Sequence, residues 1–229
     1  MLEDLKEAVL EANLELPRAG LVKLTWGNVS GRDPATGHVV IKPSGLPYGE
    51  MTAGDMVVVD SRGEVVEGER RPSTDTPTHV LLYKRLPGVG GIVHTHSTWA
   101  TAWAQAGRPV PLLGTTHADF SPFPVPVSEQ LTPEQVERGY EAETGEVIVR
   151  TLAGRSPEEV PAVLVRGHGP FCWASGPSKA VAAAVTLEAV AEVAWLTVGL
   201  REDPDLLPSH IVERHFTRKH GPGAYYGQV

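Results

Sequence analysis

The first part of the chain alternates apolar and polar residues with the period of an α-helix. The apolar side chains between Leu2 and Leu16 recur at intervals of three or four positions, and the PRAG segment at residues 17–20 ends the pattern. The same periodicity predicts helices further along the chain. Thr74 and Asp75 are candidates for the N-cap of the first of these helices. The expected ranges of the helices are 74–86, 97–107, 140–154, 178–200 and 208–220.

Short runs rich in valine and isoleucine, separated by turn-forming residues, predict β-strands between these helices. The run at 161–174 is typical of two strands that are interrupted at the triplet 167–169. The proline-rich segment 109–131 predicts irregular structure with brief strand pieces. The other expected strands are residues 21–26, 38–42, 55–60, 63–68 and 90–97.

Helices and strands are mixed along the whole chain, without an internal repeat, a low-complexity block or an obvious linker. Neighbouring strands are close enough in sequence to be antiparallel. We therefore expect residues 1–229 to form a single α/β domain in which helices cover a sheet. No glycine-rich dinucleotide motif follows a strand and no Walker motif is present, which removes the main support for a nucleotide-cofactor fold.

The composition narrows the classes of protein to which the chain can belong. Of its 229 residues, 41% are hydrophobic and 21% are charged, and the formal net charge of −8 argues against nucleic-acid binding. We see no apolar run near the roughly 20 residues of a membrane helix, and the N-terminus has no signal-peptide character. The single cysteine, Cys172, excludes an internal disulfide and suits a reducing compartment. These features predict a cytoplasmic protein that binds neither nucleic acid nor membrane.

Three histidines lie where they can converge on a metal ion. His94 and His96 are two residues apart on an expected strand, so their side chains are expected to point to the same side. Such a pair is either a metal clamp or a coincidence on a solvated face. His168 lies between Gly167 and Gly169, which allow close backbone approach and unusual dihedral angles. A third imidazole from this strand end would complete a three-histidine site with room for a substrate.

Asp75 lies at an expected junction between a loop and a helix, so two roles are open for its carboxylate. It can add a ligand to the histidines or cap the N-terminus of the helix, and the residue type alone favours the cap. His79 follows one helical turn later, where packing or solvent exposure is the simpler interpretation.

Three turn-like stretches carry the donor groups that an anion requires. Backbone N–H groups, hydroxyl groups and a lysine bind phosphate in such turns, although each stretch by itself is more often a simple turn. The candidate residues are Asn28 and Ser30 in TWGNVSGR, Lys42, Ser44 and Gly45 in IKPSG, and Ser73 and Thr74 in RPSTD.

Two further clusters are candidates for chemistry. The GTTHADF stretch contains Thr115, His117 and Asp119 in an expected loop that has no structural need for a carboxylate. Near the C-terminus, a basic cluster either reaches an anion or forms a solvated last helical turn. This cluster and the tyrosines of the glycine-rich tail that follows it are His215, Arg218, Lys219, His220, Tyr225 and Tyr226.

In this order along the chain, these segments resemble the class II aldolase/epimerase family. The resemblance runs nearly from end to end. It implies a three-layer α/β fold with a central, mainly antiparallel sheet flanked by helices, assembled as a homotetramer. The segments that carry it are GLVKLTWGNVSGRD, VIKPSGLPYGEMTAGDMVVVD, PSTDTPTH, GGIVHTHST, GTTHADF, GHGPFCW and RKHGPGAYYGQ.

The resemblance also implies a metal centre. A divalent cation would be held by His94, His96 and His168, with Asp75 as the associated carboxylate. Three histidines accept zinc, manganese or cobalt, and zinc is the default expectation.

Other matching positions are implied to bind and transform a small phosphorylated ketopentose. Asp119 and Tyr226 would be the acid/base groups, and part of each active site would come from an adjacent subunit. The implied residues of the substrate and phosphate pocket are Asn28, Lys42, Ser44, Gly45, Ser73, Thr74, Thr115, His215 and Arg218.

The activity that the resemblance implies is epimerisation of L-ribulose 5-phosphate to D-xylulose 5-phosphate at carbon 4, by cleavage and re-formation of a carbon–carbon bond. The alternative is an aldolase that cleaves a sugar 1-phosphate such as L-fuculose 1-phosphate and releases both fragments. Related aldolases commonly carry glutamate where Asp75 stands, and the HADF and AYYGQ segments fit the epimerases. A non-catalytic module of the same fold would be expected to lose the metal histidines, which this chain keeps.

Overall fold

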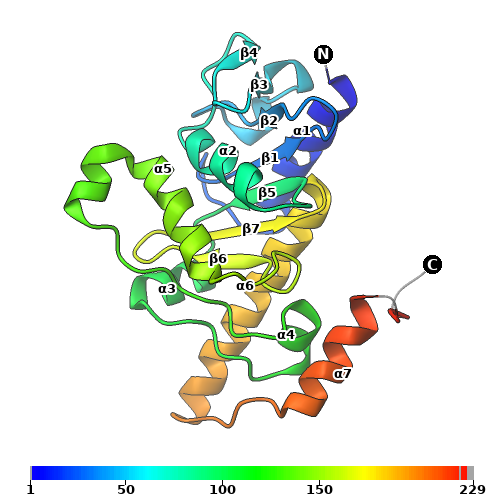
Figure 1. The fold of residues 1–229 in the computed structure, drawn as a ribbon, viewed down its shortest axis with the longest axis vertical. Coiled ribbons are helices and arrows are strands. Elements are labelled where there is room, and N and C mark those ends of the chain that lie inside the picture. Colours follow the sequence, from blue (N-terminus) through cyan, green and yellow to red (C-terminus); the bar gives the residue numbers. More distant parts are fainter. Residues whose placement is uncertain (1, 222, 226–229) are drawn as a thin grey trace.

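The computed structural model describes residues 2–221 and 223–225, and its centre is a seven-stranded sheet (Figure 1). Neighbouring strands are antiparallel, in the order β4-β3-β2-β1-β5-β7-β6. The register places Asn28 opposite His94, and His94 opposite Phe171, in the middle of the sheet. The strands are β1 (Asn28–Arg32), β2 (Val39–Ile41), β3 (Val57–Val59), β4 (Val65–Glu67), β5 (Gly91–His94), β6 (Ala162–Leu164) and β7 (Pro170–Ala174).

The helices mostly follow the apolar periodicity of the sequence. The first of them buries Val9, Ala12 and Leu16 on one side, which confirms the expected amphipathic helix. The described helices are α1 (Glu3–Arg18), α2 (Thr76–Arg85), α3 (Thr98–Ala106), α4 (Thr115–Phe120), α5 (Pro133–Leu152), α6 (Pro177–Leu200) and α7 (Ser209–Lys219), with short 3-10 turns at Tyr48–Glu50 and Ala53–Asp55.

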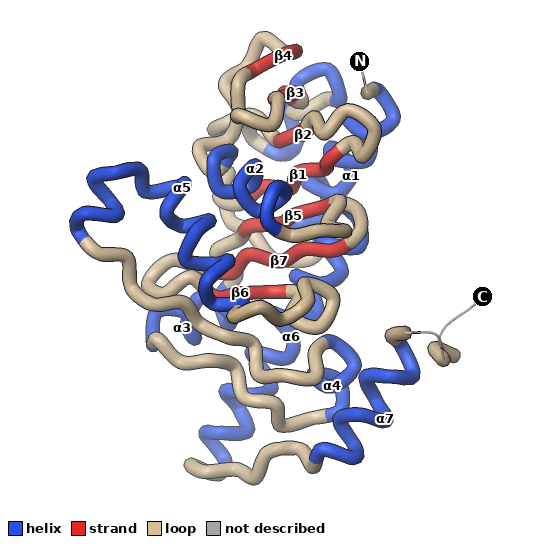
Figure 2. Tube along the Cα trace, viewed as in Figure 1, coloured by secondary structure: helices blue, strands red, loops and turns tan. Residues whose placement is uncertain are grey.

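Helices cover both faces of the sheet, because the strands direct alternate side chains to opposite sides (Figure 2). In β5, Val93 packs on the face that α1, α3 and α6 cover. The preceding residue, Ile92, packs on the opposite face with side chains of α2 and α5. This arrangement confirms the expected three-layer α/β fold with an antiparallel sheet.

The prediction of a strand at residues 21–26 is wrong. Leu24 has a φ of 50° and Gly27 a φ of 100°, and an extended strand cannot contain such residues. Leu21 and Val22 are nevertheless buried in the core. Their apolar pattern therefore reflects the burial of a loop. The strand begins only at Asn28, which pairs with His94 of β5, and pairing with β2 follows from Ser30.

The GTTHADF stretch is also not the loop that the sequence predicts, since residues 115–120 form α4. The helix begins when Ala118 N–H donates to the carbonyl of Gly114, and Ala118 and Phe120 are buried. A helix of six residues is too short to show an apolar period, which is why no sequence pattern indicated it.

Helix α5 begins at Pro133, well before the start expected at Tyr140. A capping box between Thr132 and Gln135 fixes this start, with hydrogen bonds of 2.9 and 3.3 Å. Gly139 then leaves the helical conformation, with φ 150° and ψ 94°. The kink at this glycine separates the two parts of the helix and sets the direction of Tyr140.

Helix α6 corrects the expectation that no segment has the length and apolar character of a membrane helix. Its 24 residues, with a mean hydropathy of 1.7 over the most apolar window, meet both criteria. In the fold, however, α6 packs against β5, β7, α1 and α3 and buries Leu187, Val190 and Ala191. Core helices pass the same test of length and composition, and one side of α6 packs in the core of this fold.

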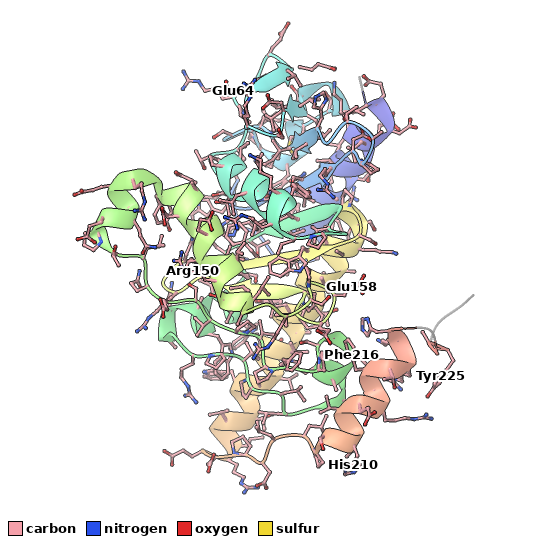
Figure 3. The ribbon with its side chains drawn as sticks, viewed as in Figure 1. Glu64, Arg150, Glu158, His210, Phe216 and Tyr225 are labelled. Atoms are coloured by element: carbon pink, nitrogen blue, oxygen red, sulfur yellow. The ribbon has the colours of Figure 1, made fainter. Side chains whose placement is uncertain are left out.

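Helix α7 lies at the end of the molecule remote from the β3–β4 edge, as the positions of His210, Phe216 and Glu64 show in Figure 3. None of its residues is buried, and it contacts the rest of the fold mainly through α4. The basic cluster of the sequence therefore lies on a peripheral helix.

Candidate metal centre

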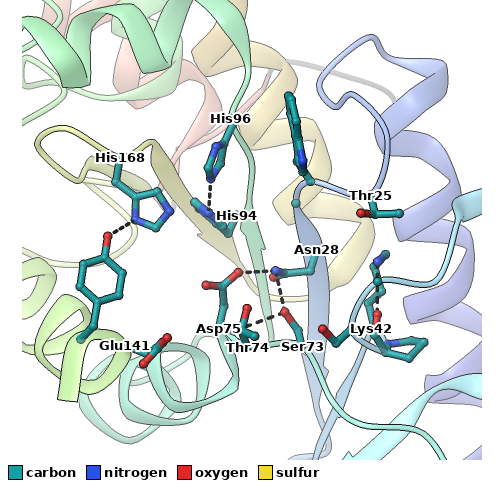
Figure 4. Close-up of a pocket in the computed structure, with 16 residues that line it drawn as sticks. Thr25, Asn28, Lys42, Ser73, Thr74, Asp75, His94, His96, Glu141 and His168 are labelled. Atoms are coloured by element: carbon teal, nitrogen blue, oxygen red, sulfur yellow. Dashed lines mark hydrogen bonds between the residues drawn. The ribbon is translucent and has the colours of Figure 1, made fainter.

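One pocket of about 410 Å³ brings together most of the residues that the sequence predicts for the site (Figure 4). It opens where β1 begins and β5 ends, at neighbouring positions in the middle of the sheet. The predicted residues that line it are Asn28, Lys42, Ser44, Gly45, Ser73, Thr74, Asp75, His94, His96 and His168.

The three histidines form one cluster. One nitrogen from each of His94, His96 and His168 lies within 4.8 Å of the others. The Nε2 atoms of His94 and His96 are 3.1 Å apart. Strand alternation does not explain this pair, because β5 ends at His94 and His96 belongs to the turn before α3. The turn, rather than the two-residue period of a strand, brings the second imidazole to the cluster.

The protonation of the cluster suits a divalent cation. His94 Nδ1 donates to the carbonyl of Pro170 at 3.0 Å, so its Nε2 carries the lone pair. Burial holds the pKa of His94 below the ordinary value. The more exposed His96 also has a lowered pKa, first through partial desolvation of its ring and then through the neighbouring His94. Burial, and then the two neighbouring imidazoles, lower the pKa of His168 to about 3. Neutral imidazoles with converging lone pairs fit a metal site, since nitrogens around tetrahedral zinc lie about 3.3 Å apart.

The glycines on either side of His168 have the two functions that the sequence predicts for them. Gly167 has a φ of 73°, which favours glycine. A Cβ atom on Gly169 would lie 2.5 Å from the carbonyl oxygen of Thr95. His168 therefore approaches the turn that carries the other two histidines only because Gly169 has no side chain.

Replacement of Gly169 by alanine should separate these two turns, because neither backbone can move without displacing a histidine. We expect the free energy of unfolding to fall by about 1–3 kcal/mol and the affinity of the purified protein for a divalent cation to fall with it. Thermal unfolding and metal analysis would measure both effects. Gly49→Ala is the matched control, because no atom lies within 4 Å of its added methyl group. Equal behaviour of the two variants would contradict this explanation.

Asp75 occupies the N-cap position of α2 but forms no side-chain cap hydrogen bond. Its carboxylate instead accepts a hydrogen bond from Asn28 Nδ2 at 2.7 Å and lines the pocket with the histidines. Burial raises the pKa of Asp75, but the neighbouring histidines and Asn28 outweigh this effect and hold it below the ordinary value. An ionised carboxylate beside the cluster is available to a cation. His79 is fully buried, where it contacts Ser30 at 2.7 Å, so the packing interpretation is confirmed.

The turn that carries His96 is held by a residue that the sequence did not indicate. Glu188 of α6 accepts hydrogen bonds from the N–H groups of Trp99 and Ala100, at 2.8 and 3.0 Å. It thereby caps α3, although Ser97 occupies the N-cap position. A carboxylate at a helix N-terminus is favourable both as an acceptor and as a negative charge.

Glu188→Ala is therefore expected to lower the free energy of unfolding by about 1–2 kcal/mol, as the loss of a cap does elsewhere. Urea unfolding of the metal-free protein would measure the change. Glu192→Ala, one turn further along α6 and exposed, serves as the control. If both substitutions destabilise the protein equally, Glu188 does not act as the cap of α3.

Several predicted site residues lie elsewhere in the chain. Thr115 lines a different pocket, between α4 and α6. His215 and Arg218 lie on α7 and contact Asp119, which does not line the histidine pocket. Tyr226 lies outside the described residues. A single subunit thus assembles the histidine cluster and the candidate anion pocket, whereas Asp119 lies outside that pocket.

Asp119 is instead the centre of an ionic cluster. Arg218 donates to its two oxygens from Nε and Nη2, at 2.8 and 2.5 Å, and His215 Nδ1 lies 3.1 Å away. Lys219 adds a third contact at 3.6 Å. Burial raises the pKa of Asp119, but the hydrogen bonds from Arg218 and His215 dominate and lower it. The basic cluster is thus not simply a solvated turn, because it reaches an anion, the carboxylate of Asp119 in the same chain.

The sequence analysis assigned no role to six other residues of the pocket wall, which are Thr25, Trp26, Gly27, Pro43, Tyr140 and Glu141. The first two belong to the TWGNVSGR stretch, but no chemistry was assigned to them. Tyr140 and Glu141 follow the kink in α5, and their neighbours in sequence form no motif. Only the path of α5 across the molecule brings them to the histidines.

Comparison with known proteins gives the same fold. Similar solved structures include an L-fuculose 1-phosphate aldolase, with 28% identity and a TM-score of 0.80 over 94% of this chain and 95% of that one. YgbL from Klebsiella pneumoniae, a candidate aldolase/epimerase/decarboxylase, has 27% identity and a TM-score of 0.74 over 93% and 99%. The L-fuculose-1-phosphate aldolase of Thermus thermophilus has 25% identity and a TM-score of 0.68 over 89% and 100%. Residues 7–195 match the family described as the class II aldolase and adducin N-terminal domain, and the chain belongs to this family.

Proposed function

We propose that the protein is a metal-dependent L-ribulose-5-phosphate 4-epimerase, which interconverts L-ribulose 5-phosphate and D-xylulose 5-phosphate. The observation that carries the proposal is that one pocket holds both a cluster of neutral histidines and a buried lysine (Figure 4). A sugar phosphate has the matching groups, because its carbonyl and hydroxyl oxygens bind a cation and its phosphate is an anion.

Lys42 supports a phosphate at one end of the pocket. It is only 2% exposed, and none of the described carboxylates offsets the effect of burial on its charge. Its ammonium group donates to the carbonyl of Pro43 at 3.2 Å and lies 5.1 Å from the centre of the Tyr48 ring. Burial lowers the pKa of Lys42, which shows that its charge is poorly solvated. A phosphate would supply the missing counter-charge, with the hydroxyl groups of Ser44 and Ser73 as further donors.

Asn28 supports a polar substrate between the two ends. Its Nδ2 donates to Ser73 and Asp75, whereas its Oδ1 is buried without a partner in the described residues. A buried acceptor that lacks a hydrogen bond costs about 1–3 kcal/mol. A substrate hydroxyl group that donates to this oxygen would remove the cost.

The reaction requires cleavage of a carbon–carbon bond. Carbon 4 is not adjacent to the carbonyl at carbon 2, so its C–H bond is not acidic enough for simple proton abstraction. Cleavage between carbons 3 and 4 gives glycolaldehyde phosphate and the enediolate of dihydroxyacetone. A divalent cation held by His94, His96 and His168 would act as a Lewis acid and stabilise the charge of the enediolate. The lysine end of the pocket would retain the aldehyde while it rotates.

We propose Asp119 and Tyr226 as the two acid/base groups. One accepts the proton of the carbon-4 hydroxyl group as the electron pair of the broken bond passes to carbon 3. After the aldehyde has presented its other face, the bond re-forms and the second group returns a proton to the new hydroxyl group. Asp119 has a lowered pKa and is therefore a carboxylate at neutral pH, which is the form that can accept a proton.

We further propose a homotetramer in which Asp119 and Tyr226 act in the pocket of an adjacent subunit, together with Thr115, His215 and Arg218. Two observations support this assembly. Asp119 does not line the histidine pocket of its own chain. In addition, the outer side of α6 exposes Val193, Trp195 and Leu196, and an exposed apolar helix face is typical of a subunit interface.

The proposal includes a single domain over residues 1–229 and a cytoplasmic location. The free, buried thiol of Cys172 is consistent with a reducing compartment.

An aldolase that cleaves L-fuculose 1-phosphate is the second candidate, because structures with this name share the fold at 28% and 25% identity. The same pocket would suit an aldolase, since cleavage that is not followed by re-formation of the bond needs the same cation-binding and phosphate-binding groups. In an aldolase the aldehyde fragment leaves the pocket, whereas in the epimerase it stays and the carbon–carbon bond re-forms.

Incubation of the metal-loaded protein with L-ribulose 5-phosphate tests the proposal, with D-xylulose 5-phosphate measured by a coupled assay. Rapid product formation that a chelator abolishes would support the epimerase. Cleavage of L-fuculose 1-phosphate without formation of xylulose 5-phosphate would assign the chain to the aldolases.

A further inference from the structure

Tyr140 contacts a member of the histidine cluster directly. Its phenol oxygen lies 3.1 Å from Nδ1 of His168, and the two rings are 6.0 Å apart between their centres (Figure 4). His168 therefore has only Nε2 left for the cluster. Tyr140 also lines the pocket, so the same side chain touches both the metal cluster and the space for a substrate.

We propose that Tyr140 is a positioning residue for the metal ligand His168, an inference that rests on the proposed metal-dependent function. Nε2 can bind a cation only when the ring proton is on Nδ1, and a proton on Nδ1 needs an acceptor. The phenol oxygen of Tyr140 is that acceptor. It fixes both the tautomer and the direction of the imidazole, as the second hydrogen bond of a metal-binding histidine generally does.

The hydrogen-bond partner of His168 is of a different kind from that of the neighbouring histidine, His94. His94 Nδ1 donates to a backbone carbonyl, that of Pro170, which follows the same turn as His168. His168 donates instead to a side chain from a distant helix. Its direction thus depends on where α5 places Tyr140, and a single substitution can remove the hydrogen bond.

The segment that carries Tyr140 is itself attached to the helix that follows Asp75. The Gly139 kink interrupts the helical conformation directly before Tyr140. The hydroxyl group of Thr144 donates to the carbonyl of Tyr140 at 2.7 Å. Thr78 of α2, which is buried, donates to the carbonyl of Glu141 at 2.6 Å. The position of Tyr140, and through it that of His168, is therefore fixed by hydrogen bonds on α2 and α5.

Titration of the metal-free protein with Co²⁺ tests the proposal, because the d–d absorption bands report the geometry of the ligands as well as the affinity. We expect Tyr140→Phe to weaken Co²⁺ binding about 10–100-fold and to shift the bands. The side chain is 37% exposed, so phenylalanine should not disturb folding. Tyr83→Phe is the control, since it loses a buried phenol bonded to Ser30, outside the cluster.

Thr78→Val supplies a second, independent variant. It should weaken Co²⁺ binding less than Tyr140→Phe does, and it should have no further effect in the double variant, because it acts through Tyr140. Unchanged affinity and bands in Tyr140→Phe, with normal binding in the unmodified protein, would overturn this inference and leave the metal site intact. Absence of Co²⁺ binding by the unmodified protein would overturn the proposed function as well.

Discussion

His96→Ala should lower the rate of epimerisation by at least about 10³-fold while leaving the fold unchanged. His96 supplies one of the three nitrogens that lie within 4.8 Å of one another. Without it, a cation would be held by two histidines and Asp75, and the charge that develops on the substrate would lose its main stabilisation. His94 is a less suitable target, because it is buried and stacks on Phe171, so its loss would leave a cavity.

The coupled assay for xylulose 5-phosphate and the metal content of the protein are the two measurements for His96→Ala. Because this side chain is exposed, the free energy of unfolding of the metal-free protein should change by less than about 0.5 kcal/mol. His210→Ala at the exposed start of α7 controls for removal of an imidazole. A His96→Ala protein that keeps more than a tenth of the activity would refute the metal assignment.

Asp119→Asn should lower epimerisation by about 10²–10⁴-fold without weakening metal binding. Asparagine keeps the shape of the side chain but cannot accept a proton. Metal affinity should persist, because Asp119 does not line the histidine pocket. Asp205→Asn, at an exposed ion pair with Arg201, is the matched control. Unchanged rates in both Asp119→Asn and Tyr226→Phe would exclude the proposed acid/base pair.

The same substitution should also change the dependence of stability on pH. The pKa of Asp119 is lower in the folded protein than in the unfolded chain, so the folded state favours the carboxylate. Its contribution to stability is therefore present above the unfolded pKa and is lost as the pH falls through the folded pKa. The difference in stability between the unmodified protein and Asp119→Asn should shrink over this acidic range.

Co-expression of His96→Ala and Asp119→Asn subunits distinguishes a shared site from one within a single chain. If Asp119 acts in the pocket of an adjacent subunit, mixed tetramers contain some sites with an intact pocket and an intact carboxylate. About a quarter of the sites would then be active by random assembly around a four-fold axis. Mixed protein that stays as inactive as the two parents would contradict a shared site.

The histidine cluster shows how far local sequence determines a site. The GGIVHTHST and GHGPFCW segments identify His94, His96 and His168, and the glycines beside His168 predict a close approach of the backbone, which the structure shows to be an approach of two turns. Any fold that brings these two turns together needs glycine at these positions for steric reasons. The glycines can therefore be recognised from the sequence alone. The period of a strand was nevertheless the wrong reason for pairing His94 with His96, because the strand ends between them.

Alternating and periodic apolar residues determined most of the secondary structure and the three layers, because burial of one face requires that pattern wherever the element lies in the fold. The pattern failed at residues 21–26, where a buried loop has the same composition as a strand, and at α4, which is shorter than two helical turns. The contacts of Glu188, Tyr140 and Asp119 are seen only in the tertiary structure. Each acts on a residue more than 25 positions away, and no local pattern of the chain records which distant side chain will meet it.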